Sequence, residues 1–206
     1  MDIQNTIDTI KSKYGFNSVE AATVIKIEMI IEVLLYNLLN NVLHVTKALG
    51  IKTIKKAHFI GVLAILKGCV KKSEGQRGGA IILPSEYFGA DSGKYFEDVV
   101  SHNTAYVDDL ARGPLFVQNA GSAVGASSVC SLVHVKTLVE KYKKEHHANF
   151  KMAKDAYELI LESILSNLDK LFKACSSTRQ KNLTANLLYK GLNSSGYGYM
   201  SCVWKQ

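Results

Sequence analysis

The side chains that could carry acid–base or metal chemistry stand next to one another in this chain, not at active-site spacings. Glu97-Asp98 and Asp108-Asp109 are adjacent pairs, so in a helix their carboxylates diverge, and we interpret them as solvated surface. His146-His147 stands in a predicted loop with no third ligand nearby, which indicates an exposed pair. The chain contains no GxSxG, P-loop or HExxH motif. We therefore expect no enzyme activity, metal site, cofactor or small-molecule substrate.

The remaining cysteines and histidines fit structural roles. The four cysteines form no CxxC pair, which argues against zinc, and with no signal peptide we expect free thiols in a reducing compartment. His44 and His58 stand beside apolar residues in predicted helices, and we interpret them as core or interface histidines.

The elements that would position functional residues are mainly helices, because only Pro84 and Pro114 interrupt the 206 residues. Residues 2–14 carry isoleucines at helical spacing and predict a short amphipathic helix. Gly15 is expected to end this helix, and Ser18 is expected to N-cap the next one.

A long helix is predicted over residues 19–49, which contain no Gly and no Pro. Its apolar residues extend well beyond one face, so we expect other elements to pack against this helix on two sides. Charged and amide side chains within this run argue against a membrane span. A second short helix is predicted over residues 54–67. The stripe of the long helix consists of Val24, Ile27, Ile31, Leu34, Leu35, Leu38, Val42 and Val45.

The order of short, long and short helix is repeated near the C-terminus, and a repeated order is the feature to weigh first. The second copy is predicted at residues 129–144, 152–175 and 183–192. Between the copies, a strand is predicted over residues 80–83 and a helix over residues 94–111.

The net charge is unevenly distributed along the chain. The total of +7 and the pI near 9.1 permit contact with nucleic acid. Residues 1–70 carry +3, residues 71–125 carry −2 and residues 126–206 carry +6. The two ends with the repeated helices are therefore basic, and the middle is not.

Short, long and short helices joined by two brief loops resemble the histone fold. In the first copy the match lies at the end of the long helix and beyond it, and in the second copy Arg179 to Thr184 stands where histones have a basic loop leading into a Thr-bearing helix start. Two copies in one chain resemble the fused histone doublets of giant DNA viruses, and also some archaeal and bacterial doublets. The matching residues of the first copy are Asn37, Thr46, Lys52, Thr53, Ile54, Phe59, Ile60 and Leu63.

Two features depart from the histone pattern. Histones clamp the second loop with an Arg paired to an Asp in the last helix, but here Ile51 and His58 occupy these places in the first copy, and Leu187 takes the acidic position in the second. Arginine is scarce, whereas histone octamers insert Arg into the minor groove. A chain with mainly lysine should hold DNA through phosphate charge and more weakly.

The resemblance implies an all-α fold in which two tandem histone folds pair as an intramolecular handshake, or pseudo-dimer, that buries the stripes of both long helices. The first histone fold would occupy residues 1–70 and the second residues 129–192. Residues 71–128 would form a partly packed linker or insertion, and residues 193–206 a Gly/Tyr-rich C-terminal tail.

In the histone fold, the loops of paired units meet the DNA backbone, and helix N-termini add N–H groups that suit phosphate. The resemblance therefore implies a set of phosphate-contacting residues in the loops. The plain alternative is that these side chains only solubilise the loops. The residues are Asn17, Ser18, Lys52, Thr53, Lys55, Lys56, Asn149, Lys151, Lys154, Arg179, Lys181 and Thr184.

We therefore expect a histone-like protein that packs double-stranded DNA without base readout and assembles into nucleosome-like particles. Its partners would be DNA and other histone-fold chains, either copies of itself or a second doublet. This role implies the nucleus, a viral factory or a virion as its location. The alternative is a histone-fold interaction subunit of a transcription, centromere-type or virion complex without strong DNA binding, which the low arginine content favours. An enzyme within residues 71–128 is a third hypothesis with little support.

Overall fold

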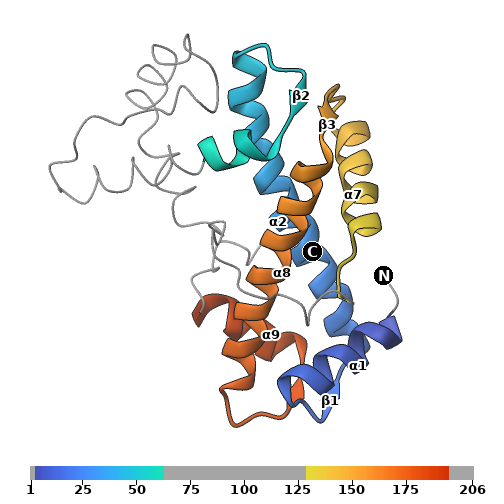
Figure 1. The fold of residues 1–206 in the computed structure, drawn as a ribbon. Helices are drawn as coiled ribbons and strands as arrows, with labels where there is room; N and C mark the ends of the chain where they lie inside the picture. Colours follow the sequence, from blue (N-terminus) through green and yellow to red (C-terminus); the bar gives the residue numbers. More distant parts are fainter. Residues whose placement is uncertain (1–2, 63–128, 195–206) are drawn as a thin grey trace, which may run out of the picture. The chain divides into compact units, whose positions relative to one another are not determined.

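The computed structural model describes residues 3–62 and 129–194, and this part of the chain is mostly helical (Figure 1). The mostly helical character predicted from the sequence is therefore confirmed. The helices are α1 (Ile3–Tyr14), α2 (Ala21–Ala48), α7 (Leu132–Glu145), α8 (Lys154–Ser176) and α9 (Ala185–Ser194), and residues 56–62 are also helical. Short strands of two residues stand between them: β1 (Ser18–Val19), β2 (Thr53–Ile54), β3 (Lys151–Met152) and β4 (Asn182–Leu183).

Helix α1 ends where the sequence predicts, but α2 begins later than expected. Gly15 adopts φ +70°, a left-handed conformation that glycine reaches without steric cost, and its N–H donates to the carbonyl of Lys11 at 3.0 Å. The prediction that Ser18 caps α2 is wrong, because Ser18 lies in β1. The helix starts after Glu20, whose carbonyl accepts a hydrogen bond from the N–H of Thr23 at 2.9 Å.

Helix α2 is a single helix of 28 residues, as the run without Gly or Pro predicts. All residues of its predicted stripe are buried. At its C-terminal end the N–H of Ile51 donates to the carbonyl of Thr46 at 2.8 Å, and Gly50 adopts φ +67°, which is the Schellman pattern of helix termination. His44 was expected in a core or an interface, but it is exposed, because it shares the outer face of α2 with Lys47.

Helix α8 is also uninterrupted, over 23 residues, and its middle is buried on all sides. Residues 163–168 are all buried, and six consecutive residues of an α-helix point in every direction around its axis. Three of them are polar, and the side-chain amide of Asn167 donates to the carbonyl of Ser163 at 2.7 Å. A charged side chain placed here would have no access to water.

The two short helices of the second copy begin two to three residues later than predicted. The side chain of Ser131 accepts a hydrogen bond from the N–H of His134 at 3.2 Å and caps α7, which therefore starts at Leu132. Helix α9 starts at Ala185, because Asn182 and Leu183 are taken up by β4. Strand formation at the loop ends is thus the reason for the later start of α9, as it is for α2.

The strands form two parallel pairs. In the first pair Ser18 lies opposite Asn182, and in the second pair Thr53 lies opposite Lys151. Strand β1 precedes α2 and β4 follows α8, whereas β2 follows α2 and β3 precedes α8. Each pair therefore joins the segment before one long helix to the segment after the other long helix.

The described residues divide into two compact units, and each unit contains residues from both halves of the chain. The first unit comprises residues 3–37, 129–148 and 157–194, and it includes α1, α7, α9 and the β1–β4 pair. The second unit comprises residues 38–62 and 149–156, and it includes the β2–β3 pair.

Some sequence predictions concern residues outside the described ranges. These are the partly packed linker or insertion at residues 71–128, with its strand at residues 80–83 and its helix at residues 94–111, the end of the predicted helix at residues 54–67 and most of the C-terminal tail. Within residues 3–62 and 129–194, no helix is both long enough and apolar enough to cross a membrane.

Gly191 of α9 packs against Cys175 of α8, which leads to a stability prediction. A Cβ atom added at Gly191 would lie 2.3 Å from the Sγ atom of Cys175 and 3.2 Å from a methyl group of Leu171. We expect Gly191→Ala to lower the free energy of unfolding by about 1–3 kcal/mol, because overpacking outweighs the better helix propensity of alanine.

Urea denaturation of a double-mutant cycle checks this. Cys175→Ala removes the Sγ atom, so the double variant should recover much of the stability that Gly191→Ala loses. A Gly191→Ala protein as stable as the unmodified chain would contradict the close contact.

Candidate functional site

The first loop pair consists of residues 17–19 and 179–184, all in the first unit. The N–H of Asn17 donates to the carbonyl of Lys181 at 2.7 Å, next to the β1–β4 pairing. The hydroxyl of Thr23, in the first turn of α2, donates to the carbonyl of Leu183 at 3.3 Å. The structure thus brings together predicted site residues that are far apart in sequence. The exposed ones are Asn17, Ser18, Arg179 and Lys181.

The second loop pair consists of residues 52–56 and 149–154, all in the second unit. The N–H of Lys151 donates to the carbonyl of Lys52 at 2.9 Å, and the N–H of Ala153 donates to the carbonyl of Ile54 at 2.9 Å. These backbone hydrogen bonds fix the two segments side by side. The predicted site residues that they bring together are all exposed: Lys52, Thr53, Lys55, Lys56, Asn149, Lys151 and Lys154.

The strand geometry explains why the polar residues of both loop pairs face solvent. Successive side chains of a strand point to opposite sides. Val19, Ile54 and Leu183 are buried, and the residue before each of them is exposed. The register that buries one apolar residue in each of β1, β2 and β4 therefore turns its polar neighbour outward, and in β3 the exposed Lys151 precedes the half-buried Met152.

The second loop pair carries the higher density of positive charge. It holds five exposed lysines, whereas the first loop pair holds Arg179 and Lys181. Lysines this close together repel one another, and a bound polyanion would relieve the repulsion. A lysine ammonium acts as a point charge toward phosphate, so the arrangement can bind a phosphate backbone but has no rigid fork for reading bases.

Two of the helix starts that adjoin the loop pairs are capped by side chains of the chain itself. The hydroxyl of Thr184 accepts a hydrogen bond from the N–H of Leu187 at 3.2 Å, so this predicted site residue also caps α9, and it is only half-exposed. At the other start, the N–H of Lys55 donates to Nδ1 of His58 at 3.1 Å, and the N–H of His58 donates back to the carbonyl of Lys55 at 3.1 Å. The bond from the N–H of Lys55 to the side chain of His58 corresponds to one half of a capping box, with histidine in place of glutamate; the other bond uses the backbone carbonyl of Lys55 and not its side chain.

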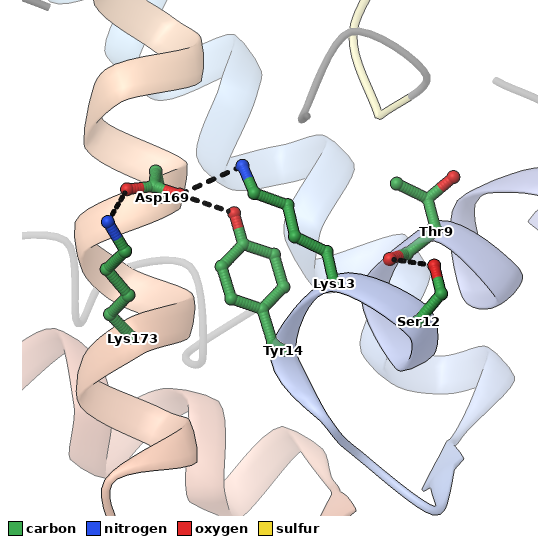
Figure 2. A network of polar contacts seen from close by, with 6 residues as sticks. All are labelled: Thr9, Ser12, Lys13, Tyr14, Asp169 and Lys173. Carbon is green, nitrogen blue, oxygen red and sulfur yellow. Dashed lines mark hydrogen bonds and ion pairs between the residues drawn. The ribbon is translucent and has the colours of Figure 1, made fainter. Parts of the chain in front are cut away.

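Sequence reasoning missed the carboxylate that fastens α1 to α8. Asp169 accepts a hydrogen bond from the hydroxyl of Tyr14 at 2.9 Å and forms ion pairs with Lys13 at 3.0 Å and with Lys173 at 2.7 Å (Figure 2). Burial alone would raise the pKa of Asp169, but the hydrogen bonds from Lys173, Lys13 and Tyr14 outweigh it and lower this pKa. Burial and the bond to Asp169 raise the pKa of Tyr14. Only the Asp169–Lys173 spacing of four residues was readable from the sequence.

We expect Asp169→Asn to lower the free energy of unfolding by about 1–2 kcal/mol at pH 7, because Lys13 and Lys173 lose their partner. The folded-state pKa of Asp169 lies below its ordinary value, so its contribution is present above about pH 4 and is lost as the pH falls further. Urea denaturation at pH 7 and at pH 2–4 measures both effects. Glu162→Gln, at an exposed acid of the same helix, is the control. A stability difference that stayed constant down to pH 2 would exclude this role.

Helix α7 is joined to α2 by exposed polar contacts in the first unit. Lys141 forms an ion pair with Glu32 at 2.7 Å, and the hydroxyl of Tyr36 donates to Glu145. The ring of Tyr36 also meets the ring of Tyr142 edge-on, with centroids 4.9 Å apart. Exposed ion pairs of this kind add little stability, so these contacts serve mainly to orient α7.

Of the groups considered for chemistry in the sequence, Glu97-Asp98 and Asp108-Asp109 lie outside the described ranges. No group of three His, Cys, Asp or Glu residues that could hold a metal ion occurs within those ranges. His146 and His147 are exposed, as predicted. Cys130 and Cys175 are buried free thiols, and burial raises the pKa of each to about 12. Both therefore stay protonated at neutral pH and are poor nucleophiles.

Comparisons with protein-family models, with curated proteins and with solved structures gave no match.

Proposed function

We propose that this chain is a histone-type doublet that packs double-stranded DNA. The observation that carries the proposal is the pairing of the loops. Each parallel strand pair joins the loop before one long helix to the loop after the other, and this is the neighbourhood in which paired histone folds meet DNA. Both loop pairs expose basic side chains, so each has the charge that a phosphate backbone requires.

The composition of the compact units supports an intramolecular handshake. Two tandem domains that folded independently would each draw on one half of the chain. Here each unit combines segments of both halves, and both long helices are uninterrupted and have buried apolar residues. In the proposed pseudo-dimer the two long helices cross and bury their stripes against each other.

In this proposal, the lysines and Arg179 neutralise phosphates, and the exposed side chains of Asn17, Ser18 and Thr53 add hydrogen bonds to phosphate oxygens. Because none of these contacts reads a base edge, binding depends on charge and on DNA bendability. The scarcity of arginine predicts weaker binding than that of arginine-rich histones.

The test is the affinity of the purified protein for random-sequence duplexes across a salt series. We expect the logarithm of the affinity to fall linearly with the logarithm of the salt concentration, and to be the same on natural and scrambled duplexes. Absence of binding at about 50 mM salt would overturn the proposal. Nuclease digestion of the protein on long DNA then tests assembly, because protected fragments of one length indicate a defined particle.

The second candidate is a histone-fold interaction subunit without strong DNA binding. The scarcity of arginine, with only Arg77, Arg112 and Arg179 in the sequence, favours this candidate. If this candidate holds, the duplex will not bind at low salt.

A further inference from the structure

We propose that His58 makes DNA binding by the second loop pair sensitive to pH, and that protonation of its imidazole weakens binding. This inference rests on the proposed function. His58 lies in the helical residues 56–62, directly after the strand β2 that forms part of the loop pair.

The hydrogen bond at Nδ1 requires a neutral imidazole. A backbone N–H can only donate, so Nδ1 of His58 must present a lone pair to the N–H of Lys55, 3.1 Å away. The proton of the neutral ring is then on Nε2. A second proton on Nδ1 would remove the acceptor and set two donors against each other. The side chain of His58 is only 8% exposed, so water cannot readily replace the lost bond.

Charged groups from two elements act on this imidazole. Burial and the charge of Lys55, on the same turn, lower the pKa of His58, and Asp155 in the first turn of α8 opposes this. The pKa of His58 is therefore lower in the folded than in the unfolded chain. The cap is intact at neutral pH, and its contribution to stability is lost as the pH falls below about 6.5 toward the lower folded-state pKa.

Loss of this cap acts directly on the lysines of the second loop pair. Lys55 donates the capping hydrogen bond to His58, Lys56 begins the helical segment, and the carbonyl of Ile54 accepts a hydrogen bond from the N–H of Ala153. Release of the first turn would free these backbones from their fixed positions. Charge alone predicts the opposite result, because an added positive charge strengthens binding to DNA. The sign of the pH effect therefore separates the two explanations.

The experiment compares the unmodified protein with His58→Asn at pH 7.5 and 5.5, at equal ionic strength, on a random-sequence duplex. The amide oxygen of asparagine can accept the bond from Lys55, but it does not titrate. We expect the affinity of the unmodified protein to fall about fivefold more on acidification than that of His58→Asn, as for the loss of a helix cap. The other histidines are present in both proteins, so their effects cancel from the comparison.

A second measurement does not depend on DNA. Amide exchange of Lys55, corrected for the intrinsic pH dependence, should accelerate at pH 5.5 in the unmodified protein and not in His58→Asn. His58→Leu, which lacks the acceptor, should bind weakly at both pH values. Equal pH dependence of binding in the unmodified protein and in His58→Asn would overturn the proposed effect of His58 protonation on binding and leave the proposed function intact. Absence of binding at every pH would overturn the proposed function and the coupling with it.

Discussion

Replacing Ile164 by aspartate is expected to abolish folding. Ile164 has no exposed surface and lies within the buried residues 163–168 of α8. Aspartate would place a charge in a buried position without water, and its sequence neighbours Ser163 and Leu165 carry no positive charge to pair with it. The cost is several kcal/mol, which is comparable to the whole stability of a domain of this size. Leu38→Asp should act in the same way, because Leu38 is buried in the stripe of α2. Circular dichroism during thermal unfolding would show the loss of the cooperative transition.

A matched substitution at an exposed isoleucine provides the control. Ile25 lies on α2 and is 56% exposed, so Ile25→Asp should change the free energy of unfolding by no more than about 1 kcal/mol, mainly through helix propensity. Native unfolding of the Ile164→Asp protein would show that this side chain is not part of the core.

Neutralising the basic residues of both loop pairs is expected to weaken DNA binding equally on any sequence. Each phosphate contact that is lost leaves a condensed counterion on the DNA, so each should flatten the plot of log affinity against log salt by about one unit. With these six contacts removed, Lys154 is the one basic residue left in the two loop pairs, and little binding should remain at physiological salt. The variant carries Gln at Lys52, Lys55, Lys56, Lys151, Arg179 and Lys181, which are exposed.

A charge-matched control separates local contacts from net charge. One variant carries Gln at Lys52, Lys55 and Lys151 of the second loop pair, and the other carries Gln at three exposed lysines of the helices, namely Lys144, Lys170 and Lys190. Both variants lose three positive charges. If binding depends on phosphate contacts by the second loop pair, only the first variant should flatten the salt dependence. An equal effect in both would mean that net charge drives binding. A loss on one sequence only would indicate a sequence-specific factor, and no loss in either would favour the interaction subunit.

The sequence by itself determined the helices, because their signals are local. The run of residues 19–49 without Gly or Pro, with apolar residues at helical spacing, permits little other than a long helix, and α2 follows it closely. Gly15 ends α1 because a positive φ is easy only for glycine. The exposure of the loop lysines could be predicted because they stand between the predicted helices and belong to no apolar stripe.

Only the tertiary structure decided how the loops pair. The pairing in turn determines which residues make up the candidate site. A strand of two residues has no alternation to detect, and its partner is far away in sequence, as Ser18 is from Asn182. For the same reason the cap expected at Ser18 was wrong, since pairing with β4 took that residue from the helix. Tyr14 and Asp169 are 155 residues apart, and Asp155, which acts on the imidazole of His58, lies on another element. Such contacts depend on which distant surfaces meet, and that is decided by packing and not by the local pattern of residues.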